Sequence, residues 1–200
     1  MKKLIISFLL IAMVGTAFSA AAIAQDKAAE TAAAPTSGPR AEFLTELKVE
    51  EDKFIKLAGA MPANKFTWRP SEDVRSVAEA YLHVAAANYN LPKLIGTAPP
   101  AGFKPQGFDK STTDKAKVIE ALKDSFAHLR RAVVNMPDAD LEKQLDWFGG
   151  KNTERGILLF MMRHMAEHLG QVIVYARVNG VVPPWTEEQQ RQMKQDKPKQ

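Results

Sequence analysis

Two histidines one helical turn apart are the residues of this sequence best suited to chemistry. His164 and His168 lie within a largely apolar stretch, residues 156–176. Residues four positions apart share one face of an α-helix, so both imidazoles can approach the same metal ion. That face also carries Ile157 and Met161, and burying two unpaired imidazoles in an apolar seam costs free energy that a metal would remove. The alternative is a pair satisfied by hydrogen bonds in a helical core, and the pair alone does not distinguish the two.

A third ligand would decide between these alternatives, and His83 is the candidate. Residues 76–79 match a capping box, which predicts that a helix starts there and continues to about residue 95. His83 falls in its second turn, with Ala80 and Ala87 one turn to either side, and such small neighbours leave room for a cavity. A lone histidine on a helix is more often a hydrogen-bonded core or boundary residue. His83 therefore becomes a ligand only if the fold brings it to the other pair.

The remaining histidine, His128, is not expected to join the site. It lies off the apolar seam of its own predicted helix, on a mixed line with Ala121, Ser125 and Asn135. This pattern predicts a boundary or surface position. The chain has no cysteine, which excludes disulfides, thiolate nucleophiles and Cys-type zinc sites. Any metal must therefore be held by His, Asp or Glu.

The first 24 residues are typical of a secretory leader. Lys2 and Lys3 precede an apolar run, and Ala22-Ile23-Ala24 fits a cleavage site. We therefore expect a periplasmic or secreted protein that begins near Gln25, with no stable membrane anchor, because the apolar run is short for a spanning helix. Removing Lys2 and Lys3 lowers the formal net charge from +4 to +2. Without a basic cluster interleaved with aromatics, the sequence does not predict nucleic-acid binding.

The rest of the chain predicts an all-α domain, a four-helix bundle with long crossover connections. Gln25 to Arg40 is Ala-rich and is predicted to be a flexible linker, and residues 41–185 form the domain. Residues 138–151 contain a Gly-Gly turn and are expected to cross the end of the bundle, and 181–185 to form an extended strap. Residues 186–200 are predicted to be a charged tail or a frayed helix. The four helices are expected at about 41–60, 76–95, 111–136 and 153–179.

These residues together resemble the DinB superfamily of metal-dependent proteins. The resemblance rests on Trp68-Arg69-Pro70, on the capping box leading into His83, on His164-x-x-x-His168-x-Gly170-Gln171 and on residues 178–184. It implies a four-helix bundle in which one histidine of the second helix and two of the fourth hold a divalent metal. Those positions correspond here to His83, His164 and His168. Better understood relatives act in the cytosol on substrates involving low-molecular-weight thiols, whereas the leader here predicts export.

The residues of such a site do not specify which reaction it catalyses. Three neutral imidazoles can hold Zn²⁺, Ni²⁺ or Fe²⁺ and leave positions for water or substrate. This favours a metal-dependent enzyme, of hydrolase or thiol-linked transferase type with no substrate specified, and the alternative is a non-catalytic binding or structural bundle. Gln171 is a candidate for hydrogen bonding near the metal, or else a polar residue packed at the seam. Glu167 completes an H-x-x-E-H zinc-protease motif, a minor alternative to a supporting or surface ion-pair role.

The helix positions also predict where a substrate would reach the metal. We expect the metal to sit inside the bundle near one end, with the segment 68–75 at the mouth and the loop 96–110 remote from it. Arg69 or Arg75 would then be available to an anionic group of a small-molecule substrate, although a single arginine in a loop is more often only solvated. We expect a monomer or a homodimer.

Overall fold

Four long helices form the folded part of the chain, as the sequence predicts. The computed structural model describes residues 33–195, and the predicted leader, residues 1–24, lies outside them. The four helices are α2 (Gly38–Ala60), α3 (Val77–Asn90), α4 (Lys115–Asn135) and α5 (Glu154–Val178). Among the described residues, no helix is both long and apolar enough to span a bilayer.

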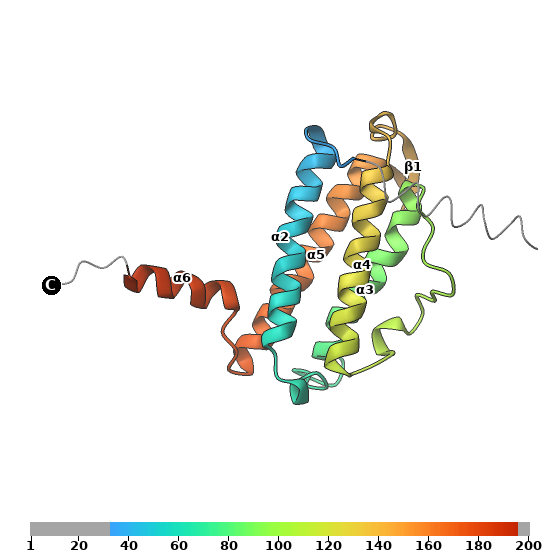
Figure 1. Cartoon of the computed structure of the whole chain (residues 1–200). Helices are drawn as coiled ribbons and strands as arrows, with labels where there is room; N and C mark the ends of the chain where they lie inside the picture. The colour runs from blue at the N-terminus through green and yellow to red at the C-terminus, as the bar shows by residue number, and fades with distance from the viewer. Residues whose placement is uncertain (1–32, 196–200) are drawn as a thin grey trace, which may run out of the picture. The chain divides into compact units, whose positions relative to one another are not determined.

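The order of the helices in space differs from their order in the chain. Helix α4 packs against α2 and α3, and α5 packs against the same two helices from the other side. Figure 1 shows that α3 and α4 run in the same direction, so residues 91–114 must return along the length of the bundle between them. This crossover contains two short 3₁₀ helices, η2 (Leu91–Ile95) and η3 (Phe108–Lys110). Another two flank the bundle, η1 (Ala63–Lys65) and η4 (Asp138–Asp140).

A cluster of aromatic rings fills the centre of the bundle. The Phe54 ring of α2 lies 6.3 Å from that of Tyr81 on α3 and 5.9 Å from that of Phe126 on α4, centroid to centroid. Phe66, from the α2–α3 connection, stacks on Tyr81 at 6.2 Å. All four side chains are fully buried. Because each large side chain contributes roughly 1.5–3 kcal/mol when removed from water, this cluster holds three of the four helices to one another.

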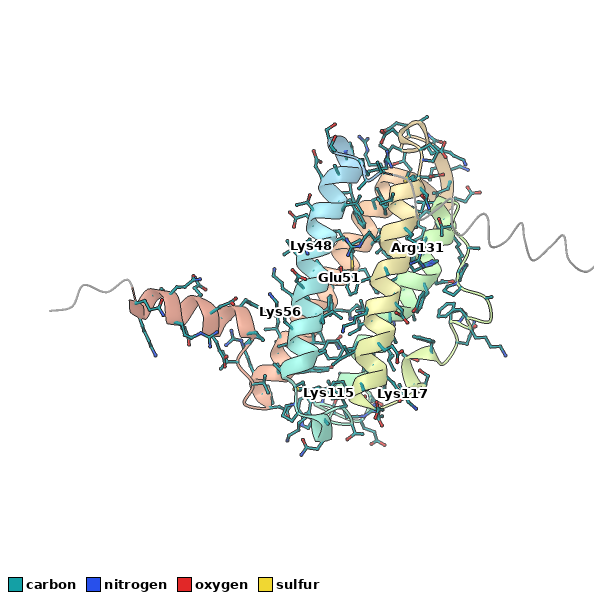
Figure 2. The ribbon with its side chains drawn as sticks, in the orientation of Figure 1. Lys48, Glu51, Lys56, Lys115, Lys117 and Arg131 are labelled. Carbon is teal, nitrogen blue, oxygen red and sulfur yellow. The ribbon has the colours of Figure 1, made fainter. Side chains whose placement is uncertain are left out.

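Charged side chains on the outer faces of α2 and α4 also join these helices. Lys115 lies between the lower ends of the two helices in Figure 2, where its Nζ donates to the carbonyl oxygens of Gly59 at 2.6 Å and Met61 at 2.8 Å. A lysine there satisfies carbonyls left free at the C-terminal end of α2 and complements its dipole. Higher on the same faces, Arg130 pairs with Glu51.

Helix α2 begins earlier than predicted. Residues 38–40 belong to its first turn rather than to the predicted linker. Pro39 stands at the beginning of the helix, where its missing N–H is not needed and its fixed φ suits the first turn. Arg40 binds Asp138 at 2.6 Å and donates to the carbonyls of Val133 and Val134, so this turn is anchored to the end of α4.

The segment between α4 and α5, which the sequence predicts to turn at Gly-Gly and to cross the end of the bundle, contains a β-hairpin. Strands β1 (Gln144–Trp147) and β2 (Gly150–Thr153) pair antiparallel, with Trp147 opposite Gly150. The two residues between them, Phe148 and Gly149, have φ values of 44° and 79°. Positive φ at both central positions characterises the type I′ turn, so Gly149 is the turn glycine and Gly150 already belongs to a strand.

The C-terminal strap is also partly helical. The prediction of an extended segment over 181–185 is wrong for its last two residues, because α6 runs from Pro184 to Gln195. Proline is favoured at the first position of a helix, where it costs no hydrogen bond. None of the α6 residues is buried, which agrees with the frayed-helix alternative for the charged tail.

The predicted position of His128 is also corrected, because this residue is buried rather than at the surface. Only 5% of this residue is exposed, and its ring lies 5.6 Å from that of Tyr89 on α3. The mixed line of α4 that carries it faces α3, where Asn88 donates to Ser125 at 3.4 Å. The Nε2 of His128 has no hydrogen-bond partner among the described residues. Which side chains α3 would place against this face was not visible in the periodicity of α4 alone.

Candidate metal centre

The position of His83 follows from the way α3 starts. Ser76 is its N-cap: the Ser76 hydroxyl accepts from the Glu79 backbone N–H at 3.3 Å, and the Glu79 carboxylate accepts from the Ser76 N–H at 3.0 Å. Arg69 holds the other Glu79 oxygen at 2.7 Å. Burial opposes the ionisation of Glu79, but the bonds from Ser76 and Arg69 and the arginine charge outweigh it and lower the pKa of the carboxyl. The start of α3 is therefore locked, and His83 follows in its second turn.

Helix α5 supplies the other two histidines from its middle. Thr153 caps it, accepting from the Gly156 N–H at 3.0 Å. Met161 and Met165 on this helix are buried, while His164 and His168 are half-buried. The pair therefore lies at the edge of the apolar face and points towards α3.

The structure brings the three predicted ligands together. The ring centroid of His83 lies 5.1 Å from that of His164 and 4.6 Å from that of His168, and the last two are 4.6 Å apart. One ring nitrogen from each residue lies within 4.8 Å of the other two. All three residues are half-buried, so the site lies between α3 and α5 and remains partly exposed to solvent.

The spacing of the nitrogens suits a shared ion. Nε2 of His83 and Nε2 of His164 are 3.2 Å apart. Two imidazoles on one tetrahedral zinc, each about 2.0–2.1 Å from the metal, would have their nitrogens about 3.3–3.4 Å apart. Three histidines leave a fourth position open, as in catalytic rather than closed structural zinc sites. A metal bound there could polarise a substrate oxygen or acidify a water molecule.

The imidazoles are also in the protonation state that a metal requires. Burial, with the charge of Arg75 and the neighbouring His168, lowers the pKa of His83 to about 4, against a smaller opposing effect of Asp109. Burial and the neighbouring His168 and His83 likewise lower the pKa of His164 to about 4. Both rings are therefore neutral at pH 7, with a lone pair free for coordination.

A chain of hydrogen bonds sets the orientation of His168. Its Nδ1 lies 2.9 Å from Oε1 of Gln171, whose Nε2 donates to the Tyr175 hydroxyl at 2.9 Å. That hydroxyl donates to the backbone carbonyl of Arg75 at 3.1 Å. A carbonyl can only accept, so each preceding group must donate along the chain, and Nδ1 of His168 carries the proton. Its Nε2 is left as the coordinating atom. This arrangement favours the first of the two alternatives for Gln171, a hydrogen-bonding residue near the metal, over a polar residue packed at the seam.

Glu167 takes no part in this arrangement. It is exposed and pairs with Arg163 one turn away at 3.7 Å. It is not among the groups gathered at the three ring nitrogens. This position favours the surface ion-pair role and gives no support to a general base of the H-x-x-E-H type.

The residues around the site correct part of the prediction about where a substrate would enter. Trp68 packs edge-on against Tyr175, at 5.4 Å between ring centroids, so the 68–75 segment does border α5 near the site. The loop 96–110 is not wholly remote, because Asp109 lies 3.7 Å from the Arg75 guanidinium and its charge acts on His83. The loop aromatics Phe103 and Phe108 pack on Tyr89 instead, at 5.2 and 6.0 Å. They line a separate hollow against α4 that contains none of the three imidazoles.

Comparison with known proteins agrees with this fold. The sequence profile described as the DinB superfamily matches residues 46–172, and the chain belongs to that superfamily. A DinB-like protein from Bacillus subtilis has a similar structure, with a TM-score of 0.58 and 20% identity over 70% of this chain and 93% of that one. Another, from Bacillus cereus, has a TM-score of 0.63 and 17% identity over 71% and 93% of the two chains. No curated protein matches the sequence significantly.

Proposed function

We propose that this protein is an exported member of the superfamily that binds one divalent metal ion through His83, His164 and His168 and uses it on a small-molecule substrate. The observation that carries the proposal is the convergence of three ring nitrogens within 4.8 Å of one another, from helices far apart in the sequence. Desolvation of these half-buried imidazoles opposes their convergence, and a bound metal would offset that cost in addition to the hydrogen bonds between His164 and His83 and between His168 and Gln171.

The open coordination position favours an enzyme over a structural site. Zinc in structural sites takes four protein ligands, whereas this cluster offers three. Among first-row metals, imidazole ligands suit Zn²⁺, Ni²⁺ and Fe²⁺, and the cluster contains no thiolate or carboxylate to select among them. The reaction would be of hydrolase or transferase type, in which the metal acts as a Lewis acid or activates water.

Metal analysis of the purified protein tests this proposal. The chain from Gln25 onwards should be produced without a histidine tag and without added metal, and its metal content measured by mass spectrometry. We expect about one divalent ion per chain, and the identity of that ion selects among Zn, Ni and Fe. Each of the three single variants, His83→Ala, His164→Ala and His168→Ala, should lose the retained metal.

His128 provides the matched control, because it is a buried histidine of the same chain that lies outside the cluster. His128→Gln should keep the metal. Full metal retention in all three ligand variants would overturn the proposal. Folded wild-type protein without metal, and without affinity for added Zn²⁺, Ni²⁺ or Fe²⁺, would favour the non-catalytic bundle instead.

Export is a separate part of the proposal and rests on the N-terminal sequence alone. Expression of the full chain in a Gram-negative host, followed by cell fractionation and N-terminal sequencing, tests it. We expect a periplasmic product that begins near Gln25. A cytoplasmic product that retains Lys2 and Lys3 would contradict the proposed location without affecting the metal site.

A further inference from the structure

Two arginines, Arg69 and Arg75, lie in the segment immediately before α3. Arg69 donates to the Val74 carbonyl at 3.0 Å and to the Glu79 carboxylate at 2.7 Å, so its role is to fix the start of the helix. Arg75 differs, because its Nε is buried and has no hydrogen-bond partner among the described residues. Its nearest acid is Asp109, at 3.7 Å, beyond hydrogen-bond reach. A buried guanidinium donor without an acceptor is costly, and such a group calls for an explanation.

Arg75 also lies beside the candidate metal centre. Its backbone carbonyl accepts the hydrogen bond from Tyr175 that ends the chain starting at His168. Its positive charge acts on both His83 and His164. The side chain is 40% exposed, so the part beyond the buried Nε remains within reach of a small molecule.

The charge balance at the site favours an anion. Three neutral imidazoles leave the charge of a bound divalent metal uncompensated, and the Arg75 guanidinium adds a further positive charge. Asp109 is the one acid whose charge acts on either of the two histidines with lowered pKa. Glu79 is occupied by Arg69 and the capping box, and Glu167 by Arg163. A metal-loaded site is therefore electropositive.

We propose that Arg75 binds the oxyanion of a small substrate, a carboxylate or a phosphate, whose other end is held at the metal. The inference rests on the proposed metal function and specifies its substrate class. The planar guanidinium matches the two oxygens of such a group, and the N–H groups beyond the buried Nε supply the donors. Asp109 forms an ion pair with the guanidinium at 3.7 Å, as Glu167 does with Arg163, but makes no hydrogen bond to the Arg75 Nε. A neutral molecule with the same metal-binding group lacks this second contact.

A matched pair of ligands tests the proposal by binding. Succinate monohydroxamate and butyrohydroxamate have the same chain length and the same metal-binding hydroxamate, and only the first ends in a carboxylate. Binding to the Zn²⁺-loaded protein should be measured by calorimetry at pH 7 in a phosphate-free buffer. We expect the wild type to bind the carboxylate-bearing ligand at least about tenfold more tightly, which corresponds to about 1.4 kcal/mol. Inorganic phosphate should compete with that ligand at the same site.

Variants then test whether Arg75 causes the preference for the carboxylate-bearing ligand. Arg75→Gln should retain stoichiometric zinc and bind the two hydroxamates equally. Arg163→Gln is the matched control, because Arg163 also acts on His164 but is exposed and pairs with Glu167 on its own helix. This variant should keep the preference for the carboxylate-bearing hydroxamate. Equal affinities in the wild type, or an undiminished preference in Arg75→Gln, would overturn the proposal. If the wild type instead holds no zinc, the metal function itself fails, and that failure is seen before any hydroxamate is added.

Discussion

His168 and Gln171 are joined by a hydrogen bond of 2.9 Å between Nδ1 and Oε1. Because Gln171 is bonded in turn to Tyr175, and Tyr175 to the Arg75 carbonyl, the amide cannot rotate without breaking a second bond. The bond thus selects the tautomer of His168 that leaves Nε2 free. It also connects the fourth helix to the segment that carries Arg75, so ligand orientation and substrate recognition share one set of contacts.

Gln171→Leu should weaken zinc binding by about 10- to 100-fold, the usual cost of losing a hydrogen-bond partner of a ligating histidine. Competition with a chromogenic chelator measures the dissociation constant. Gln144→Leu, at an exposed position of β1, is the control and should not change it. Unchanged zinc affinity in Gln171→Leu would show that the contact does not orient the ligand.

Metal-free protein should lose stability as the pH falls below about 6.5. The unfolded chain binds protons at histidine near that pH, whereas the pKa of His83 and of His164 in the folded state is about 4. Between these values the unfolded state binds more protons, so the free energy of unfolding decreases with falling pH until about pH 4. Urea titrations of chelator-treated protein across this range measure the slope.

Replacing His83 and His164 together by Gln should flatten that pH dependence, since both titrating groups are then absent. Burial also lowers the pKa of His128, so a small slope of the same sign should remain. An identical slope in the double variant and the wild type would contradict the assignment of the acid sensitivity to these two histidines.

Ser76→Ala should cost about 1 kcal/mol of stability through loss of the N-cap, and it should also weaken zinc binding because His83 lies in the second turn of the same helix. Asp114→Ala removes the corresponding cap from α4, which carries no ligand. We expect a similar loss of stability there, measured by urea denaturation, without a change in zinc affinity. Equal effects of the two variants on zinc would argue that the position of His83 does not depend on its capping box.

Wild-type zinc binding should raise thermal stability, because the three ligands converge only in the folded chain. At a free zinc concentration about 100 times the dissociation constant, the gain is about 2.7 kcal/mol. Calorimetry should show a higher melting temperature with zinc for the wild type and His128→Gln, and no shift for His164→Ala. A comparable shift in His164→Ala would indicate zinc binding elsewhere on the protein.

The oligomeric state is predicted to be monomeric or dimeric. Helix α5 exposes large apolar side chains near both of its ends, with Leu159 at 69% and Val178 at 67% exposure. Light scattering on the chain from Gln25 measures the mass in solution. A larger assembly would contradict the description of the four helices as one self-contained core.

Local sequence was sufficient for the helices. Periodicity and caps depend on residues within one or two turns, so Ser76 and Thr153 predicted the starts of α3 and α5, and the spacing of His164 and His168 placed both on one face. His83 joined the candidate ligand set only through the resemblance to the DinB superfamily. The same local information predicted a frayed helix as one alternative for the tail. It could not predict where the bundle places its polar residues relative to one another.

Those relationships depend on contacts between segments far apart in the chain. His128 is buried against Tyr89 where α4 packs on α3, and Gln171 reaches the Arg75 carbonyl only through Tyr175. Asp109 approaches Arg75 because the crossover returns along the bundle. Sequence periodicity records which face of a helix is apolar, but which side chains meet across an interface is decided by packing, and packing is a property of the tertiary structure alone.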